Sequence, residues 1–174
     1  MTQIVVGTGA GESTANSYGS LADSNTYWVT ERLDTTWENA EDTAKCAALI
    51  VGTQYLDATY QWSGCKFVDT SSLRWPRSGA LDRDGFSIAN NTIPQAVIDA
   101  LFELGKLALS GPLLSVEDRS GLIKSIFQKV DVLEERTEWM EGASGVQDYL
   151  LVDRMLAGLY GSKTGGATVL LLRV

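Results

Sequence analysis

Apolar residues recur at helical spacing in four stretches of the chain, at about residues 20–33, 39–58, 92–110 and 144–161. Each stretch begins at a Ser, Thr or Asn that is followed three residues later by Asp or Gln, a pair that can cap the first turn of a helix. The third also has Pro94 in its first turn, where proline is tolerated. The pattern therefore predicts four helices and a mainly α fold.

The second and third predicted helices are apolar on more than one face. A helix that is apolar over most of its circumference is surrounded by protein, either inside its own domain or against a neighbouring subunit. We therefore expect these two helices at the centre of the domain or at a subunit interface. The apolar positions are Ala44, Cys46, Ala48, Leu49, Ile50, Val51, Tyr55 and Leu56 in the second helix, and Val97, Ile98, Leu101, Phe102, Leu104, Ala108 and Leu109 in the third.

Two segments outside the helices have the character of strands. Residues 122–139 mix β-branched and charged side chains, which predicts a β-hairpin. Residues 162–168 are small and polar, and the chain then ends in a run whose two strand faces are both mostly apolar. We expect 162–174 to be an arm that docks on another protein chain, the alternative being that it folds back onto its own hairpin. The docking side chains would be Val169, Leu170, Leu171, Leu172 and Val174.

The N-terminal stretch contains a glycine-rich segment, Gly7 to Gly11, after a short apolar run. A phosphate-binding loop needs four residues between its glycines and then a lysine, whereas this segment encloses three and continues with Glu12. We therefore expect residues 1–17 to be an extended N-terminal arm.

An aromatic-rich loop lies between the second and third predicted helices, at residues 62–94. Each buried aromatic ring removes about 150–250 Å² from water, so this loop should be fixed to the domain, with Trp62, Trp75 and Pro76 as its structural core. Arg74 and Arg77 flank Trp75 and could pack on the rings or pair with carboxylates. The alternative is that Arg74, Trp75 and Arg77 stack on and neutralise single-stranded DNA.

The charge and the missing residue types narrow the function. The 174 residues carry a formal net charge of −8, which disfavours non-specific DNA binding. There is no histidine for a catalytic triad or a common metal site, and Cys46 and Cys65 have no motif spacing, so we expect neither an enzyme nor a cofactor. The stretch 82–85 has the composition of a turn rather than of a complete calcium loop. No apolar run reaches the roughly 18 residues of a membrane span, so we expect no membrane contact.

Several short motifs follow one another in a specific order along the chain. They are Ile4-Val5-Val6, Ala15-Asn16-Ser17-Tyr18, Tyr55-Leu56-Asp57, Tyr60-Gln61-Trp62-Ser63-Gly64, Arg74-Trp75-Pro76-Arg77-Ser78-Gly79-Ala80, Asp82-Arg83-Asp84-Gly85 and Ile93-Pro94-Gln95-Ala96-Val97. This order resembles the DnaT-like single-stranded-DNA-binding family of tailed phages. The match runs from residue 4 to about residue 110 and is weaker afterwards. That family is akin to head–tail adaptors, small helical proteins that form rings beneath the phage portal.

The resemblance implies a four-helix head–tail-adaptor-like domain at 18–161, with a small hairpin at about 122–139 and arms at 1–17 and 162–174. It further implies a structural protein of the virion neck, assembled in the host cytoplasm as a homo-oligomer, usually a dodecamer. Its partners would be the portal and a tail, stopper or tail-terminator protein, and genomic double-stranded DNA would pass without specific binding. Glu134, Glu135 and Glu138 would then face the DNA channel. The alternative function is that of a single-stranded-DNA-binding replication protein.

Overall fold

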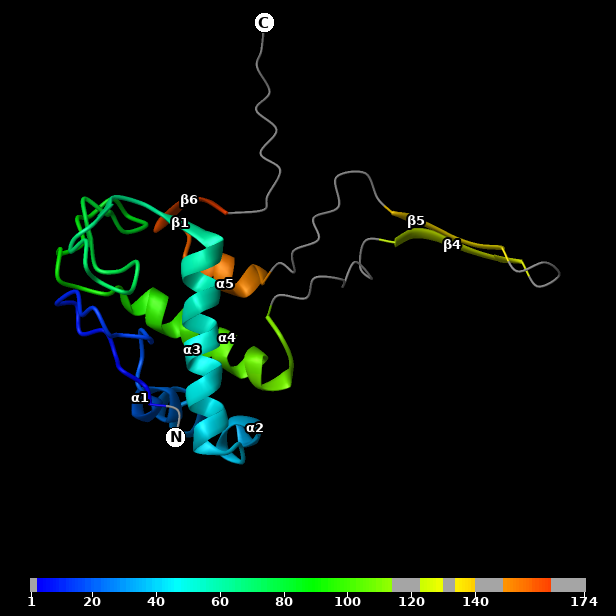
Figure 1. Ribbon diagram of the computed structural model, residues 1–174, viewed down its shortest axis with the longest axis horizontal. Helices are drawn as coiled ribbons and strands as arrows, with labels where there is room; N and C mark the ends of the chain where they lie inside the picture. Colours follow the sequence, from blue (N-terminus) through cyan, green and yellow to red (C-terminus); the bar gives the residue numbers. More distant parts are fainter. Residues whose placement is uncertain (1–2, 114–122, 130–133, 140–148, 164–174) are drawn as a thin grey trace, which may run out of the picture. The chain divides into compact units, whose positions relative to one another are not determined.

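The computed structural model describes residues 3–113, 123–129, 134–139 and 149–163 (Figure 1). Contacts divide the chain into two units. The main unit consists of residues 1–113 and 149–164, and the hairpin unit of residues 114–148 and 165–174.

Two long helices, α3 (Asp42–Thr59) and α4 (Gln95–Ser110), cross and pack against each other at the centre of the main unit (Figure 1). Two glycines allow the close approach. A Cβ atom at Gly52 of α3 would lie 2.9 Å from Leu101 Cδ1, and one at Gly105 of α4 would lie 3.0 Å from Leu49 Cδ2. Leu49 and Leu101 are fully buried, so the predicted apolar faces of these two helices do meet in the core.

Shorter helical elements precede α3. Trp28 and Trp37 are both buried and anchor this region, because the Trp28 indole donates to the Phe102 carbonyl at 3.1 Å and the Trp37 indole donates to Asn25 Oδ1 at 3.0 Å. The first predicted helix, at about 20–33, is present as a short α-helix that continues directly into a π-helix. The elements are α1 (Leu21–Asn25), the π-helix η1 (Thr26–Thr30) and α2 (Thr35–Glu38).

Three two-stranded antiparallel sheets occur within the described ranges. The strand β1 leaves the end of α3 and pairs with β6, which lies about 100 residues later in the chain. The pair β2 and β3 closes the base of the aromatic loop. The strands are β1 (Tyr60–Trp62), β2 (Cys65–Lys66), β3 (Arg77–Ser78), β4 (Ile123–Lys129), β5 (Glu134–Trp139) and β6 (Tyr160–Lys163).

The prediction of a four-helix adaptor-like domain is wrong. Only α3 and α4 are long helices within the described residues, and the other helices are short. The fourth predicted helix is reduced to α5 (Leu150–Met155). Gly158 then turns the chain with φ +93°, and the segment that was predicted to finish the helix pairs with β1 instead. The predicted start of that helix, at 144–148, lies outside the described residues.

In the hairpin unit, β4 pairs with β5, where the sequence predicts a hairpin. Glu134, Glu135 and Glu138 lie on β5, opposite Lys129, Gln128 and Ser125 respectively. The expected docking residues of the C-terminal arm, 169–174, lie outside the described residues. No helix in the described parts of the chain is both long and apolar enough to cross a bilayer.

Candidate functional site

The glycine-rich N-terminal segment forms a loop held against the main unit. The Val5 amide donates to Asn16 Oδ1 at 2.8 Å, and the Ser72 amide donates to the Glu12 carbonyl at 3.1 Å. Gly9 has φ +93°, and a Cβ atom there would lie 2.0 Å from the Asn91 carbonyl oxygen. Glycine is thus required for close backbone packing at this position.

The aromatic loop is organised around buried rings. Trp75 is only 1% exposed, and its ring meets that of Trp62 edge to face at 5.8 Å between centroids. Pro76 is also fully buried. In this arrangement Trp75 is not available to stack on a base, whereas Phe67 and Phe86 are exposed.

Arg77 closes the loop from within. Its guanidinium donates to the carbonyls of Ser63 at 2.7 Å, Gly64 at 2.6 Å, Arg74 at 3.1 Å and Trp62 at 3.3 Å. Burial lowers the pKa of this group. No carboxylate of the described residues lies within 4 Å of it. Arg77 is therefore a structural clamp whose positive charge is balanced by carbonyl dipoles rather than by an ion pair.

The backbone amide of Arg74 binds a hydrogen-bonded pair formed by Tyr18 and Asp57. The Tyr18 hydroxyl donates to Asp57 Oδ1 and accepts from the amides of Arg74 at 3.1 Å and Trp75 at 3.2 Å. The Arg74 amide also donates to Asp57 Oδ2 at 3.1 Å. The Arg74 side chain is exposed, and its guanidinium forms no ion pair within the described residues.

Burial raises the pKa of the Asp57 carboxyl, and the hydrogen bonds from Tyr18 and from the Arg74 amide offset part of that rise. The pKa of Tyr18 is raised as well, first by burial and then by the charge of Asp57. The Tyr18 proton therefore stays on its oxygen, and the pair carries the single negative charge of Asp57 near neutral pH.

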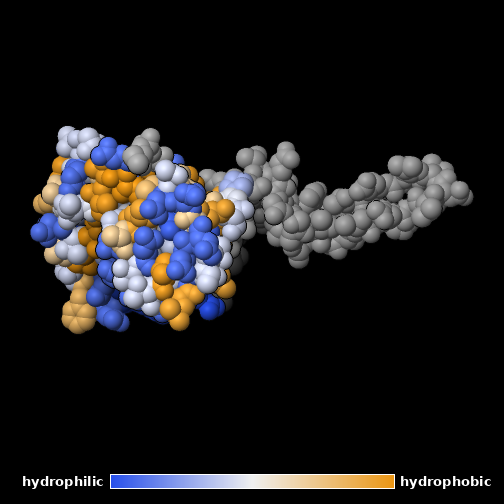
Figure 2. Space-filling model, turned by 90° about the horizontal axis from the view of Figure 1, so that it is seen from below, coloured by the Kyte–Doolittle hydropathy of each residue, from blue (hydrophilic) through white to orange (hydrophobic). Residues whose placement is uncertain are grey.

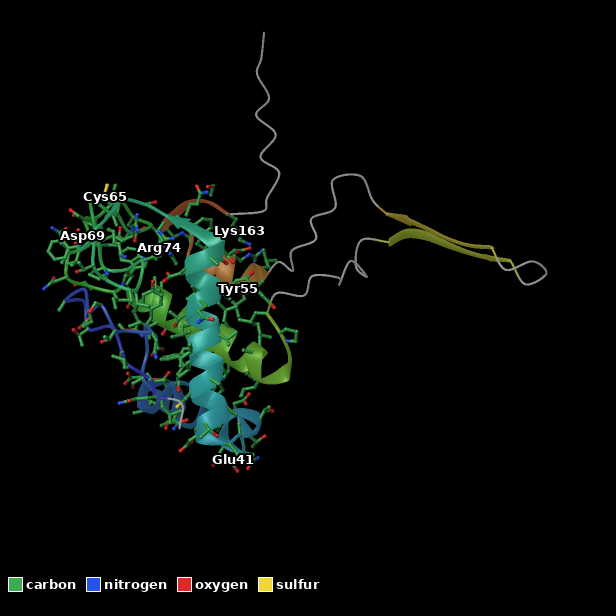
Figure 3. All side chains as sticks on the ribbon, in the orientation of Figure 1. Glu41, Tyr55, Cys65, Asp69, Arg74 and Lys163 are labelled. Atoms are coloured by element: carbon green, nitrogen blue, oxygen red, sulfur yellow. The ribbon has the colours of Figure 1, made fainter. Side chains whose placement is uncertain are left out.

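Two neighbouring cavities share Asp57, Ala58 and Arg74 in their linings. Figure 3 labels Arg74 beside the end of α3 that leads into β1. We call the larger one, of about 450 Å³, the Thr53 cavity, and the smaller one, of about 370 Å³, the Arg77 cavity. The Thr53 cavity is also lined by Ala15, Asn16, Thr53, Gln54, Ser72 and Leu73. The Arg77 cavity is also lined by Tyr60, Gln61, Trp62 and Arg77.

A third cavity, of about 520 Å³, lies between the 82–89 loop and α5 and has Arg83 and Arg154 in its lining. Asp82 Oδ1 accepts from the amides of Asp84 at 3.0 Å and Phe86 at 2.8 Å, so this carboxylate stabilises the predicted turn. Among the residues that the structure describes, no group of three or more acidic or cysteine side chains could hold a metal ion.

The sequence singled out Arg74, Arg77 and Trp75 but attached no role to Tyr18, Thr53 or Asp57. Tyr18 and Asp57 stand in the motifs 15–18 and 55–57, and Asp57 is an acid at the end of a largely apolar helical segment. Asp57 is therefore the residue from which the sequence could indicate this site, because a carboxylate on an apolar helix is expected to accept hydrogen bonds from nearby donors. The buried Thr53 hydroxyl forms no hydrogen bond in the described structure, and no feature of the sequence pattern predicts this.

Comparison with known proteins adds one match. No curated protein and no solved structure matches this chain. The sequence matches the family described as "Putative DnaT-like ssDNA binding protein" over residues 2–174. Because the match covers nearly the whole chain, the protein belongs to this DnaT-like family.

Proposed function

We propose that this protein binds single-stranded DNA, with Arg74 contacting phosphate at the Arg77 cavity and Arg77 adding positive charge from its place inside the loop. The family description supports this function over that of a structural adaptor. The observation that carries it is the presence of two arginines without an ion pair in one cavity, against the single carboxylate of Asp57. A local net charge of about +1 is enough to attract one phosphate group to this place.

The rest of the protein sets the strength of binding. The formal net charge of −8 repels DNA at long range, so we expect micromolar affinity at low salt and rapid loss of binding as salt is added. The buried Trp75 takes no part in base stacking in this proposal. Phosphate contacts, rather than an aromatic platform, supply most of the affinity.

Fluorescence anisotropy with a labelled 20-nucleotide single strand tests this function. Arg74→Gln should weaken binding and reduce the slope of log K against log salt by about 0.7, the value for one phosphate contact on a single strand. Arg154→Gln is the matched control, because Arg154 is exposed but lies in the third cavity, which shares no lining residue with the other two. Absence of binding at 20 mM salt, or equal losses in both variants, would contradict the proposal.

A second candidate function is the head–tail adaptor ring, and exposed apolar side chains favour it. Leu150 and Leu151 are adjacent on α5 and are 61% and 57% exposed, and Phe86 is 72% exposed. Figure 2 shows apolar side chains reaching the surface between hydrophilic ones on one face. Large apolar side chains left in water are typical of surfaces that bind another protein.

In this second proposal, twelve copies form a ring in the virion neck that contacts the portal and a tail protein, while Glu134, Glu135 and Glu138 repel the passing DNA. Mass photometry with and without portal tests it. The double variant Leu150→Ser with Leu151→Ser should prevent ring formation, whereas Leu33→Ser, at a more exposed position outside α5, should not. A monomer that ignores portal at micromolar concentration would rule out the ring.

A further inference from the structure

Thr53 is a buried polar residue with no hydrogen-bond partner. It lies on α3, is only 2% exposed, and its hydroxyl oxygen accepts and donates no hydrogen bond in the described structure. Buried hydroxyls are nearly always paired, and an exception calls for an explanation. A threonine in a helix commonly bonds to the carbonyl four residues earlier, and this one does not. The side chain lines the Thr53 cavity, where a ligand could supply the missing partner.

The other polar groups of the Thr53 cavity narrow the kind of ligand. The Asn16 amide is already used, because it accepts from Val5 and donates to the Gln3 carbonyl at 3.0 Å. The Gln54 amide is exposed and forms no side-chain hydrogen bond with the described residues. Asp57 and Arg74 also line this cavity, but both belong to the part that it shares with the Arg77 cavity. Thr53 and Gln54 line the Thr53 cavity only, and they offer donors and acceptors without charge, which suits a neutral group that has both along one edge.

The walls and the size of the cavity fit a flat group. Ala15, Ala58 and Leu73 provide apolar contact beside the polar pair. A volume of about 450 Å³ lies in the usual range of about 300–1,000 Å³ for small-ligand sites.

The neighbouring Arg77 cavity fixes where the charged part of such a ligand would lie. Arg74 lines both cavities, so a phosphate at the Arg77 cavity would lie next to the Thr53 cavity. A neutral planar group with hydrogen-bonding edges, attached to a phosphate, is a nucleotide.

We propose that the Thr53 cavity receives one base of the bound strand and reads its hydrogen-bonding edge through Thr53 and Gln54. This inference rests on the proposed phosphate contact at Arg74 and adds base preference to it. The protein would then discriminate between bases at one position while its other contacts remain independent of sequence.

The test compares binding of 15-nucleotide dT, dC and dA oligomers with an abasic oligomer of the same length, which keeps the phosphates but lacks bases. The wild-type protein should distinguish the tightest-binding base from the weakest by at least about fivefold, the lower end for one good base-edge contact. It should bind the abasic oligomer more weakly still. Thr53→Val should reduce the discrimination to less than twofold and leave the abasic affinity unchanged.

Thr59→Val is the matched control, because Thr59 is a buried threonine of the same helix that lines neither cavity. It should keep the full discrimination. Melting temperatures of both variants verify that they fold. Equal binding of all four oligomers by the wild type would overturn the base site and leave the proposed function standing.

Mononucleotides separate the two proposals further. If no oligomer binds but a deoxynucleoside monophosphate does, with a preference that Thr53→Val removes, the base site stands and single-stranded-DNA binding fails. If inorganic phosphate binds as tightly as every monophosphate, the base site is overturned.

Discussion

The Tyr18 hydroxyl donates a hydrogen bond to Asp57 Oδ1 and thereby joins the N-terminal loop to the C-terminal half of α3. The same oxygen of Tyr18 accepts from the Arg74 amide. The half-buried Asp57 carboxylate therefore fixes the backbone from which Arg74 extends, and its negative charge opposes the phosphate that we assign to Arg74. Its hydrogen bonds favour binding at Arg74, whereas its charge disfavours it.

Asp57→Asn should strengthen binding of single-stranded DNA. The asparagine amide keeps an oxygen that can accept from Tyr18, but its NH2 group cannot accept from the Arg74 amide, and the negative charge beside Arg74 is lost. We expect about a fivefold gain in affinity at low salt, or roughly 1 kcal/mol, the size expected for one unit charge near a partly solvated groove. Anisotropy titrations measure the gain, which should shrink as salt is added. Unchanged binding with an intact fold would show that the carboxylate charge does not act on the ligand, and weaker binding would show that the hydrogen bond to the Arg74 amide matters more than the charge.

Binding by the wild-type protein should depend on pH through the same group. Burial raises the pKa of Asp57, so lowering the pH through that raised pKa neutralises the group and should strengthen DNA binding. Between the unfolded pKa of about 3.9 and the raised folded pKa, the folded state holds more protons than the unfolded state. The stability contribution of Asp57 therefore also increases as the pH falls. Asp57→Asn should remove the pH dependence, and a dependence that persists would assign it to another group.

Thr53→Val should stabilise the free protein. The hydroxyl is buried without a partner, and such a group costs about 1–3 kcal/mol relative to a paired one. A methyl group in place of the hydroxyl removes that penalty. Valine and threonine have similar helix propensities, so the substitution should not weaken the helix itself. We expect the free energy of unfolding to rise by about 1 kcal/mol in urea titrations. A clear decrease would mean that the hydroxyl has a partner in solution, and its role in base recognition would then fail as well.

Gly64→Ala should destabilise the loop that holds Arg77. Gly64 has φ +72°, and a Cβ atom there would lie 2.4 Å from the Ser78 carbonyl oxygen. Strain of about 1–2 kcal/mol for the left-handed conformation adds to about 1–3 kcal/mol for the clash, so we expect a loss of about 3 kcal/mol. The Gly64 carbonyl also accepts from Arg77, so DNA affinity should fall in parallel.

Gly79→Ala is the control for this substitution. Gly79 also has φ +72°, but no atom lies within 4 Å of the position of a Cβ atom. It should lose only the conformational part, about 1–2 kcal/mol. Equal losses in thermal melts of the two variants would show that the backbone clash at Gly64 is relieved at little cost.

The sequence predicts the two central helices well because their signals are local. The second predicted helix, 39–58, is α3 (Asp42–Thr59), and the third, 92–110, is α4 (Gln95–Ser110). Apolar periodicity and Pro94 determine their positions. The pairing of β1 with β6 joins segments about 100 residues apart, and no local periodicity contains that information. The last helix was predicted too long for the same reason.

The candidate site shows the same limit. The sequence places Arg74 and Arg77 together, yet they have different surroundings. Arg77 is enclosed by carbonyls of the chain that leaves β1, including that of Ser63, whereas Arg74 is exposed. Which arginine is enclosed depends on where the backbone carbonyls point, and carbonyl directions follow from tertiary packing rather than from residue types.

Tyr60→Phe tests the pairing of β1 with β6 that replaces the end of the predicted last helix. The Tyr60 hydroxyl donates to Asp153 Oδ1 at 2.6 Å, and the Lys163 ammonium lies 2.6 Å from Asp153 Oδ2. Burial raises the pKa of Tyr60, and the bond to Asp153 raises it further, so the hydroxyl keeps its proton and remains a donor near neutral pH. These three side chains tie β1, α5 and β6 together.

Loss of a hydrogen bond to a charged acceptor should lower the free energy of unfolding by about 1.5–3 kcal/mol. Lys163→Met removes the other partner of Asp153, and the double variant should show coupling of at least about 0.5 kcal/mol, because both partners share one carboxylate. Amide hydrogen exchange should speed up in 160–163 in each single variant. If the last helix instead continued to residue 161, Tyr60 would not contact this segment. Additive losses of stability in the double variant, with unchanged amide hydrogen exchange at 160–163, would therefore argue against the strand pairing.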